Sequence, residues 1–264
     1  MDWGNLPSRL EGCGIKPNLL HLHQYFLIDE KALNRIVGIA EIEPQDIVME
    51  IGSGVGNITE LLAEQADKVL AYEVDKRFNV FLGSLVKRYP NIIVRLEDIK
   101  RVKWPEFDRL VANIPFNTLE PILPKLVQSK VRNVVLVVGN RFRQIVGESL
   151  SSDQITKLSV MMHAFFKIDE CFLIEKSKFY PEPAMDAIVV ELIPIKPKTY
   201  FLQFCRSLFE NQNKLVEHVL KLYESHCDRR CPQKSKVNLP IDMLNKRADH
   251  LSNSDFEKLF LCFA

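Results

Sequence analysis

Short hydrophobic runs alternate with amphipathic stretches along the first two thirds of the chain. The stretches repeat hydrophobic residues every three or four positions, as surface helices do, and the runs have the length of buried strands. Strands are predicted at 47–51, 68–74, 91–96, 109–114 and 133–138. Helices are predicted at 57–66, 76–88, 118–128, 140–149 and 153–165. This alternation indicates βαβ units, and therefore an α/β fold with a parallel sheet between two layers of helices.

Two further strand patterns, 167–175 and 186–194, bring the predicted sheet to seven strands. Only a short proline-rich segment joins them, so we expect an antiparallel hairpin at the end of the sheet. Before the first strand, Asp29 is a predicted N-cap of a helix. Residues 1–20 are rich in glycine and proline and are predicted to be irregular. The helical pattern after the prolines near 196 predicts two domains, a sheet domain at 1–196 and a small helical domain at 197–264.

Three of the ten glycines lie close together after the first strand, at Gly52, Gly54 and Gly56, with Glu50 just before them. Only glycine turns a backbone this sharply and lets it approach a ligand closely. A dinucleotide fingerprint would need another glycine at the position of Asn57. The spacing E-x-G-x-G-x-G instead resembles the S-adenosylmethionine turn of Rossmann-type methyltransferases. A tight strand-to-helix turn without a ligand is the alternative.

Acidic residues follow the next two strands. Glu73 stands where nucleotide-binding sheets place a carboxylate that accepts hydrogen bonds from ribose hydroxyls. Asp98, with Glu97 beside it, ends the third strand and can accept a hydrogen bond from an adenine amino group. The alternative for Asp98 is a helix cap or a solvated acid. Because parallel strands end at one edge of the sheet, these acids and the glycine turn are predicted to share one site.

The fourth strand ends in Asn113-Ile114-Pro115-Phe116. The side-chain carbonyl of Asn113 and the backbone carbonyl of Ile114 can accept hydrogen bonds from an exocyclic amine, and Phe116 can stack on its base. Phe179, before a P-x-P turn, can supply a second aromatic face. The alternatives are a plain Asn-Ile-Pro turn into a helix for the first motif and core packing for Phe179.

Together these motifs resemble the ribosomal RNA adenine-N6,N6-dimethyltransferases, a family that includes the macrolide-resistance enzymes. The family's Q-x-F-L, E-x-G-x-G-x-G, N-[LI]-P-[YF] and F-x-P-x-P motifs occur here in order over 23–194. The resemblance implies a class I methyltransferase sheet that binds S-adenosylmethionine. The cofactor-binding residues that it implies are Gln24, Tyr25, Leu27, Glu50, Gly52, Gly54, Gly56, Glu73, Val74, Glu97, Asp98 and Asn113. The catalytic residues that it implies are Asn113, Ile114, Pro115, Phe116 and Phe179.

The resemblance also implies the reaction, which is methylation of adenine N6 near the 3′ end of small-subunit rRNA, with two adjacent adenines each dimethylated, during ribosome biogenesis. A monomer acting in the cytoplasm is expected. Two alternatives within the family are a large-subunit enzyme of the macrolide-resistance type and an inactive cofactor-binding assembly factor. A DNA adenine methyltransferase is less consistent with the motif, since those enzymes usually carry a second proline in place of Ile114.

The charge balance bears on the substrate. The chain has 35 basic and 34 acidic residues, a net charge of +1, whereas proteins that grip bare RNA are usually more basic. The first tail helix carries one cation at 210–214, where relatives often have a basic run. Other basic candidates for contact with phosphates are Lys100, Arg101, Lys103, Arg141, Arg143, Arg229 and Arg230. A preassembled particle is therefore the expected substrate.

The sequence predicts neither a metal site nor a membrane span. His218, His226, Cys227 and Cys231 match no common zinc spacing. The six cysteines are expected to be reduced thiols. No run of hydrophobic residues is long enough for a transmembrane helix, and residues 1–10 have no signal core.

Overall fold

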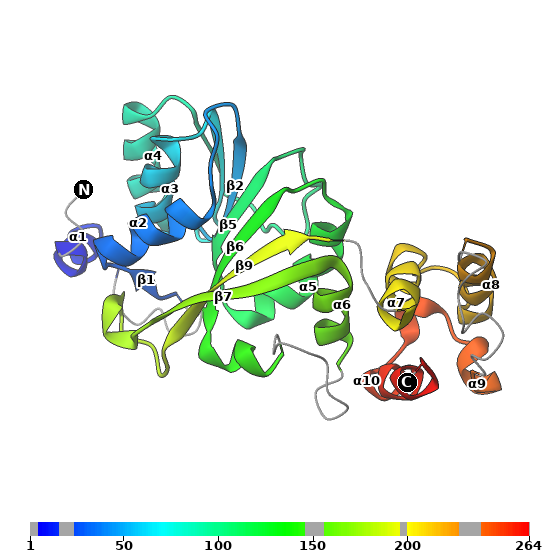
Figure 1. Ribbon diagram of the computed structural model, residues 1–264. Helices are drawn as coiled ribbons and strands as arrows, with labels where there is room; N and C mark the ends of the chain where they lie inside the picture. Colours follow the sequence, from blue (N-terminus) through cyan, green and yellow to red (C-terminus); the bar gives the residue numbers. More distant parts are fainter. Residues whose placement is uncertain (1–4, 16–23, 146–155, 196–199, 227–238, 264) are drawn as a thin grey trace. The chain divides into compact units, whose positions relative to one another are not determined.

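The computed structural model describes residues 5–15, 24–145, 156–195, 200–226 and 239–263 (Figure 1). The chain forms two compact units, residues 1–142 with 169–193 and residues 143–168 with 194–264. Sequence analysis predicted one boundary at 196. The structure instead groups helix α6 (Lys157–Phe165) with the C-terminal helices, because α6 packs against α7 (Tyr200–Glu210) and α10 (Asn253–Phe263).

The first unit is built on a seven-stranded sheet. In spatial order its strands are β4 (Ile92–Arg95), β3 (Lys68–Tyr72), β2 (Ile47–Ile51), β5 (Arg109–Asn113), β6 (Asn133–Gly139), β9 (Ala187–Pro194) and β7 (Phe166–Ile174). The first five strands are parallel to one another, and β9 is antiparallel to β6. The α/β fold and the seven strands predicted from sequence are confirmed.

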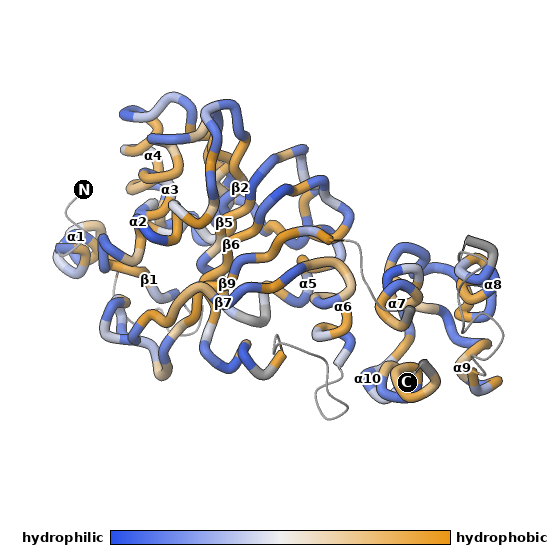
Figure 2. Tube along the Cα trace, viewed as in Figure 1, coloured by the Kyte–Doolittle hydropathy of each residue, from blue (hydrophilic) through white to orange (hydrophobic). Residues whose placement is uncertain are grey.

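The strand order changes direction between β2 and β5, and this positions the helices. The chain moves outward from β2 to β4 in one direction and from β5 to β6 in the other. Right-handed crossovers therefore place α3 (Asn57–Ala63) and α4 (Asn79–Arg88) on one face, and α5 (Phe116–Gln128) on the other (Figure 1). Strand β6 is buried along nearly its whole length, and its hydrophobic residues are visible in Figure 2.

Helix α2 (Glu30–Ile39) begins where the sequence predicted. The carboxylate of Asp29 accepts a hydrogen bond of 2.9 Å from the amide of Ala32, so the predicted N-cap is confirmed. Among the described helices, none has the combination of length and apolar character that a bilayer span requires.

Three local predictions differ from the structure. Within the segment predicted to be irregular, α1 (Leu6–Gly12) is a helix, because Leu6 and Leu10 pack on one face and its proline lies in the first turn, where it is tolerated. Of the helix predicted at 140–149, residues 140–144 form a 3-10 helix, and 146–149 lie outside the described residues. Two short strands, β1 (Phe26–Leu27) and β8 (Phe179–Tyr180), pair in a small second sheet that the sequence did not predict.

The second unit is helical, as the tail pattern predicted. Besides α6, α7 and α10 it contains α8 (Val216–His226) and α9 (Ile241–Leu244). Aromatic side chains form its core, and the rings of Phe209 and Phe256 stack with their centroids 5.5 Å apart.

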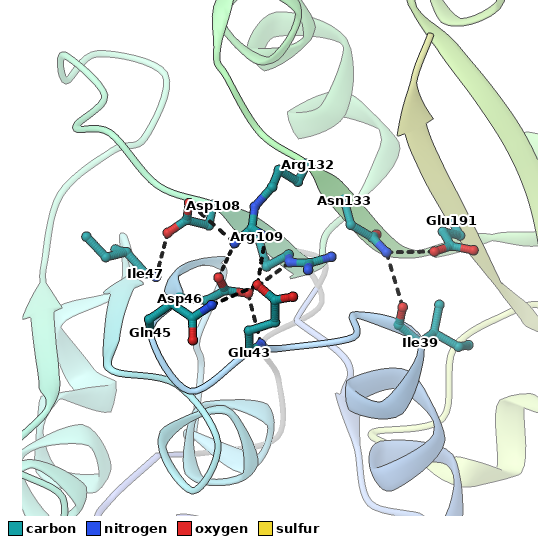
Figure 3. Close-up of polar contacts among 10 residues, drawn as sticks. All are labelled: Ile39, Glu43, Gln45, Asp46, Ile47, Asp108, Arg109, Arg132, Asn133 and Glu191. Carbon is teal, nitrogen blue, oxygen red and sulfur yellow. Dashed lines mark hydrogen bonds and ion pairs between the residues drawn. The ribbon is translucent and has the colours of Figure 1, made fainter.

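A buried ion cluster closes the amino-terminal edge of the sheet (Figure 3). The side chain of Asp46 is fully buried and accepts hydrogen bonds from the Glu43 amide at 3.0 Å and the Arg109 guanidinium at 2.9 Å, and it also pairs with Arg132. Burial by itself raises the pKa of Asp46, but these donors and charges outweigh burial and lower it. The carboxylate is therefore ionised in the folded protein and joins the starts of β2, β5 and β6.

Replacing Asp46 by Asn is expected to destabilise the protein. The substitution keeps the size of the side chain but removes the charge that two arginines share, which costs about 2 kcal/mol. Because the pKa of Asp46 is lowered in the folded state, this contribution is present at neutral pH and is lost as the pH falls through that lowered pKa. Thermal unfolding of Asp46→Asn at several pH values measures this difference.

Glu43→Gln is the matched control, because Glu43 pairs with the same Arg132 but is about half exposed. A smaller loss is expected from it. Equal loss in both variants, at every pH, would contradict the assignment of the stabilisation to the buried carboxylate.

Candidate functional site

The glycine turn after β2 lies at the carboxyl-terminal edge of the sheet, at the switch in strand order. Gly52, Gly54 and Gly56 all have positive φ angles, of 79°, 53° and 86°. The amide of Gly52 donates to the carbonyl of Tyr72 at the end of β3, at 2.9 Å. A Cβ atom on Gly52 would lie 3.3 Å from the backbone oxygen of Asn113 at the end of β5. The turn therefore connects the ends of the three central strands.

The missing side chains of the other two glycines face the protein. A Cβ on Gly54 would lie 2.8 Å from the ring of Phe26, and one on Gly56 would collide with Leu85. These two positions therefore require glycine for packing as well as for their backbone conformation. Contact of the turn with a cofactor stays a prediction.

Two carboxylates are buried below the turn. Glu73 is 6% exposed and accepts hydrogen bonds of 2.8 Å from the amides of Gly54 and Asp75. Burial raises the pKa of Glu73, although these bonds oppose the rise. Glu50 is 1% exposed and accepts a hydrogen bond of 2.5 Å from the hydroxyl of Thr59. Burial, assisted by the charge of Glu73, raises the pKa of Glu50 to about 7.

The residues after Glu73 form the exposed rim of the site. Val74 is 61% exposed and lies directly after the buried Glu73. Asp75 accepts a hydrogen bond of 3.0 Å from the side-chain amide of Gln24. Burial alone would raise the pKa of Asp75, but hydrogen bonds from Arg77 and Gln24 lower it to about 2. The other end of the Gln24 amide, Oε1, is buried and has no donor among the described residues.

Glu97 and Asp98 lie beyond β4 rather than at its end, because β4 stops at Arg95. Glu97 is exposed, and Asp98 accepts a hydrogen bond of 3.0 Å from the amide of Lys100. Asp98 also pairs with the side chains of Lys100 and Arg101, at 3.9 and 3.5 Å. The ammonium of Lys125 donates to the carbonyls of Ile99, Lys100 and Val102, which fixes the loop that carries Asp98.

The end of β5 presents two hydrogen-bond acceptors. The side-chain Nδ2 of Asn113 donates to the carbonyl of Tyr25 at 3.0 Å, and the amide of Ile114 donates to the carbonyl of Val137 at 3.3 Å. In the described part of the chain, no donor is bound to Oδ1 of Asn113 or to the carbonyl of Ile114. Pro115 then begins α5 as its N-cap residue. The side chain of Phe116 lies outside what the structure describes, so its stacking role stays a prediction.

The small sheet brings the first and last predicted motifs together. Phe26 faces Tyr180 and Leu27 faces Phe179 in the antiparallel pair β1–β8. Leu27 is fully buried, and Phe179 is 5% exposed and packs in the same hydrophobic core. The core-packing alternative for Phe179 therefore describes its place in this structure, and contact with a base stays a prediction.

The sequence of this chain is similar to those of known proteins. The family model for ribosomal RNA adenine dimethylase matches residues 19–258. The chain belongs to the ribosomal RNA adenine dimethylase family. A probable ribosomal RNA small subunit methyltransferase A of Methanosarcina mazei is 33% identical over 87% of both chains. The ribosomal RNA small subunit methyltransferase A of Thermotoga maritima is 32% identical over 81% of this chain and 82% of its own.

Solved structures agree with this membership. A dimethyladenosine transferase from Plasmodium falciparum has a TM-score of 0.61 at 25% identity, and the match covers 89% of this chain and 96% of that one. The 23S rRNA methyltransferase ErmE has a TM-score of 0.60 at 24% identity, covering 90% and 99%, and shows a shared fold. This adenine dimethylase is therefore an S-adenosylmethionine-dependent enzyme that acts on rRNA.

The edge of the sheet fits that cofactor. The buried Oε1 of Gln24 is a free acceptor, Glu73 is a buried carboxylate beside the turn, and Val74 offers an exposed apolar surface. These are the partners that an amino group, a ribose and a purine would need. In this dimethylase, Gln24, Glu73 and Val74 would hold the cofactor, which supplies an electrophilic methyl group when bound.

Several basic residues of the chain are paired with acids. In the second unit, ion pairs of Lys and Arg include Arg206–Glu210, Lys221–Glu217, Lys246–Asp255 and Arg247–Asp249. In the first unit, Lys100 and Arg101 pair with Asp98, whereas Lys103 and Arg141 are exposed and carry no described ion pair. Arg143 is exposed as well, while Arg229 and Arg230 lie outside the described residues.

The described residues contain no group of three possible metal ligands. Of the four residues considered for zinc, Cys227, Cys231 and the His226 side chain lie outside the described part.

Sequence reasoning missed three residues that shape the site. Asp75 holds Gln24, Lys125 holds the Asp98 loop, and Asn57 binds the carbonyl of Leu27 through its side chain. A signal existed for Asn57, because it occupies the position where a dinucleotide fingerprint has glycine. No local sequence pattern marks Lys125 or Asp75. Lys125 binds the carbonyl of Lys100 and Asp75 binds the side chain of Gln24, and both partners are distant in the sequence.

Proposed function

We propose that the chain dimethylates N6 of two adjacent adenines near the 3′ end of small-subunit rRNA, and that its substrate is a partly assembled small subunit. The names of the Methanosarcina and Thermotoga relatives support the small subunit as target. The observation that carries the chemistry is the pair of acceptors at the end of β5. The intact Asn113–Pro115 motif argues against an inactive assembly factor.

The geometry explains how an amine can be methylated without a strong base. Oδ1 of Asn113 and the carbonyl of Ile114 accept the two hydrogens of the adenine amine, which fixes the nitrogen and directs its lone pair. The hydrogen bond from Nδ2 to Tyr25 keeps the amide in that orientation. The nitrogen becomes cationic once it has accepted the methyl group, so its proton is acidic and leaves to water.

The charges support a particle rather than bare RNA as substrate. Affinity for bare RNA grows with the number of phosphates that free cations neutralise. The net charge of this chain is +1, and Arg206, Lys221, Lys246 and Arg247 of the second unit are each paired with an acid. Surfaces that are organised in a preformed particle would supply the remaining affinity.

In this proposal the two units of the chain have different roles. The sheet unit, residues 1–142 with 169–193, supplies the chemistry, and the helical unit, residues 143–168 with 194–264, docks on the particle. We infer that a monomer is the active species. We place the reaction in the cytoplasm, where the proposed particle substrate would assemble.

The test compares three substrates with labelled cofactor at the same salt concentration. They are an immature small particle that lacks the modification, its deproteinised rRNA, and large-subunit rRNA. We expect label on adenine N6 near the 3′ end of the small-subunit rRNA within the particle, and at least about tenfold less on its bare rRNA, from the loss of a few contacts. Equal or better activity on bare large-subunit rRNA would overturn the proposal and favour the macrolide-resistance type.

A further inference from the structure

Residues 24–28 form a strap across the carboxyl-terminal edge of the sheet, and one side of this strap pairs with β8. The amide of Ile28 donates to the carbonyl of Lys178 at 2.9 Å, and Phe26 faces Tyr180. Hydrogen-bonded and non-bonded pairs alternate in an antiparallel ladder. Leu27 is therefore in a non-bonded pair, and its carbonyl points away from β8. The carbonyl of Tyr25, two residues earlier, points the same way.

Two asparagine side chains donate hydrogen bonds to these two outward carbonyls. Nδ2 of Asn57, at the start of α3, donates to the carbonyl of Leu27, and Nδ2 of Asn113 donates to that of Tyr25 at 3.0 Å. Asn57 is 6% exposed, and its Oδ1 accepts a hydrogen bond of 3.0 Å from the amide of Ile58. Both ends of the Asn57 amide are thus satisfied, which fixes its orientation. The free edge of the strap is held by side chains instead of a neighbouring strand.

We propose that Asn57 is a positioning residue for Asn113. By holding the carbonyl of Leu27, Asn57 fixes the strap, and the strap in turn holds the Asn113 amide through the carbonyl of Tyr25. An asparagine amide whose ends are both free can rotate by half a turn, which would present its NH₂ group to the incoming amine. The Tyr25 carbonyl selects the rotation in which Oδ1 of Asn113 faces the substrate.

Other contacts fix the two ends of the strap, and Asn57 fixes the part between them through Leu27. Gln24 is bound to Asp75 at 3.0 Å, and Asp29, just after the strap, pairs with Lys178 at 3.1 Å. Between these contacts, the ring of Phe26 fills the space that Gly54 leaves open. Leu27 has no donor for its outward carbonyl other than Asn57 among the described residues, and a buried carbonyl without a donor is costly.

The inference rests on the proposed function, because it assigns Asn113 the amine of the substrate. It is tested with two variants of the full chain. Asn57→Asp keeps an acceptor for the Ile58 amide but loses the donor to Leu27, whereas Asn57→Ala loses both. Loss of one such hydrogen bond corresponds to about a tenfold change. We expect kcat to fall about tenfold in both variants, with a smaller change in cofactor affinity measured by calorimetry.

A second measurement, amide hydrogen exchange, needs no cofactor and accompanies the kinetics. Amide hydrogen exchange of Ile28 should become faster in both variants, because the strap loses the support of its free edge. Asn34→Asp is the matched control, since Asn34 is exposed on α2 and its Nδ2 donates to the carbonyl of Glu30. Its kcat and the exchange of Ile28 should equal those of the wild type. Wild-type kcat in Asn57→Asp would overturn the inference and leave Asn57 with a structural role at the start of α3.

A double-mutant cycle separates positioning from a general structural effect. In a chain that already carries Asn113→Ala, the further change Asn57→Ala should cost little additional rate, because the group it positions is gone. An additive loss would overturn the inference. Failure of the proposed function is recognised separately, since the wild type would then label a different nucleic acid, and the same cycle can be measured on that substrate.

Discussion

The variant Asn113→Ala is expected to lose methyl transfer by about a hundredfold or more, the effect of removing an essential positioning and electrostatic contact. The substitution removes Oδ1, which would accept a hydrogen from the amine, and it also frees the carbonyl of Tyr25. Cofactor affinity should stay within a few-fold of the wild type, because all the residues predicted to bind the cofactor except Asn113 itself lie outside β5. Single-turnover rates on the particle and calorimetry with the cofactor measure the two effects.

Asn34→Ala is the control for this experiment, because Asn34 is an exposed residue of α2. Asn113→Asp adds a sharper comparison. An aspartate keeps an oxygen at the position of Oδ1 but places a second oxygen against the carbonyl of Tyr25, so it should also be strongly impaired. A wild-type transfer rate in either Asn113 variant would remove this residue from the catalytic role.

The parallel sheet could be predicted because its strands are buried on both faces and bounded by turn residues. Strand 47–51 was predicted with the bounds that β2 has, and the N-cap at Asp29 follows from a local rule. The glycine- and proline-rich composition of residues 1–20 is misleading, because Pro7 lies in the first turn of α1, where a helix tolerates proline. Local sequence patterns are therefore sufficient to predict a helix or strand where its intrinsic propensity and its burial agree.

The small sheet β1–β8 could not be predicted, because two-residue strands carry no periodicity and their pairing joins segments that are about 150 residues apart in the chain. The grouping of α6 with the tail helices has the same cause, since it depends on packing between distant segments. The family motifs predicted which residues form the site, but not the hydrogen bonds that hold these residues in place. That Asn113 is held by Tyr25, and Gln24 by Asp75, became visible only in the structure.

The packing at the glycine turn changes how substitutions there should be interpreted. Glycine turns in nucleotide-binding sheets are usually explained by the approach of a ligand. Here the space beside Gly54 is occupied by Phe26, which belongs to the strap, and the space beside Gly56 by Leu85 of α4. Larger residues at these two positions would move the strap or the helix. Loss of cofactor binding in such variants would therefore not by itself place the glycines in contact with the cofactor.

The buried pair of Glu50 and Glu73 leads to the second large effect, which is a dependence of stability on pH. The pKa of Glu50 is raised from 4.5 to about 7 in the folded protein. Between these two values the folded state binds more protons than the unfolded state, so the free energy of unfolding falls as the pH rises and levels off above about 7. The difference between the two pKa values corresponds to about 3 kcal/mol for this fully buried group.

Glu50→Gln is therefore expected to be more stable than the wild type at pH 8 and similar to it near pH 4.5. A glutamine keeps an acceptor for the hydroxyl of Thr59 but never carries the buried charge. Thermal unfolding of both proteins across this pH range, without cofactor, measures the difference. Glu60→Gln is the control, since the Glu60 carboxylate pairs with Arg88 instead. Parallel curves for the wild type and Glu50→Gln would show that Glu50 is not the group that titrates.

The same carboxyl should report the arrival of the cofactor. A cation close to the pair of acids lowers the pKa of Glu50, because it stabilises the ionised form. Binding of S-adenosylmethionine, whose sulfonium and ammonium groups are positive, is therefore expected to release protons near pH 7. Calorimetric titration in two buffers with different ionisation enthalpies measures the number of protons released. The release should disappear in Glu50→Gln, and an equal release in both proteins would place the cationic part of the cofactor away from Glu50.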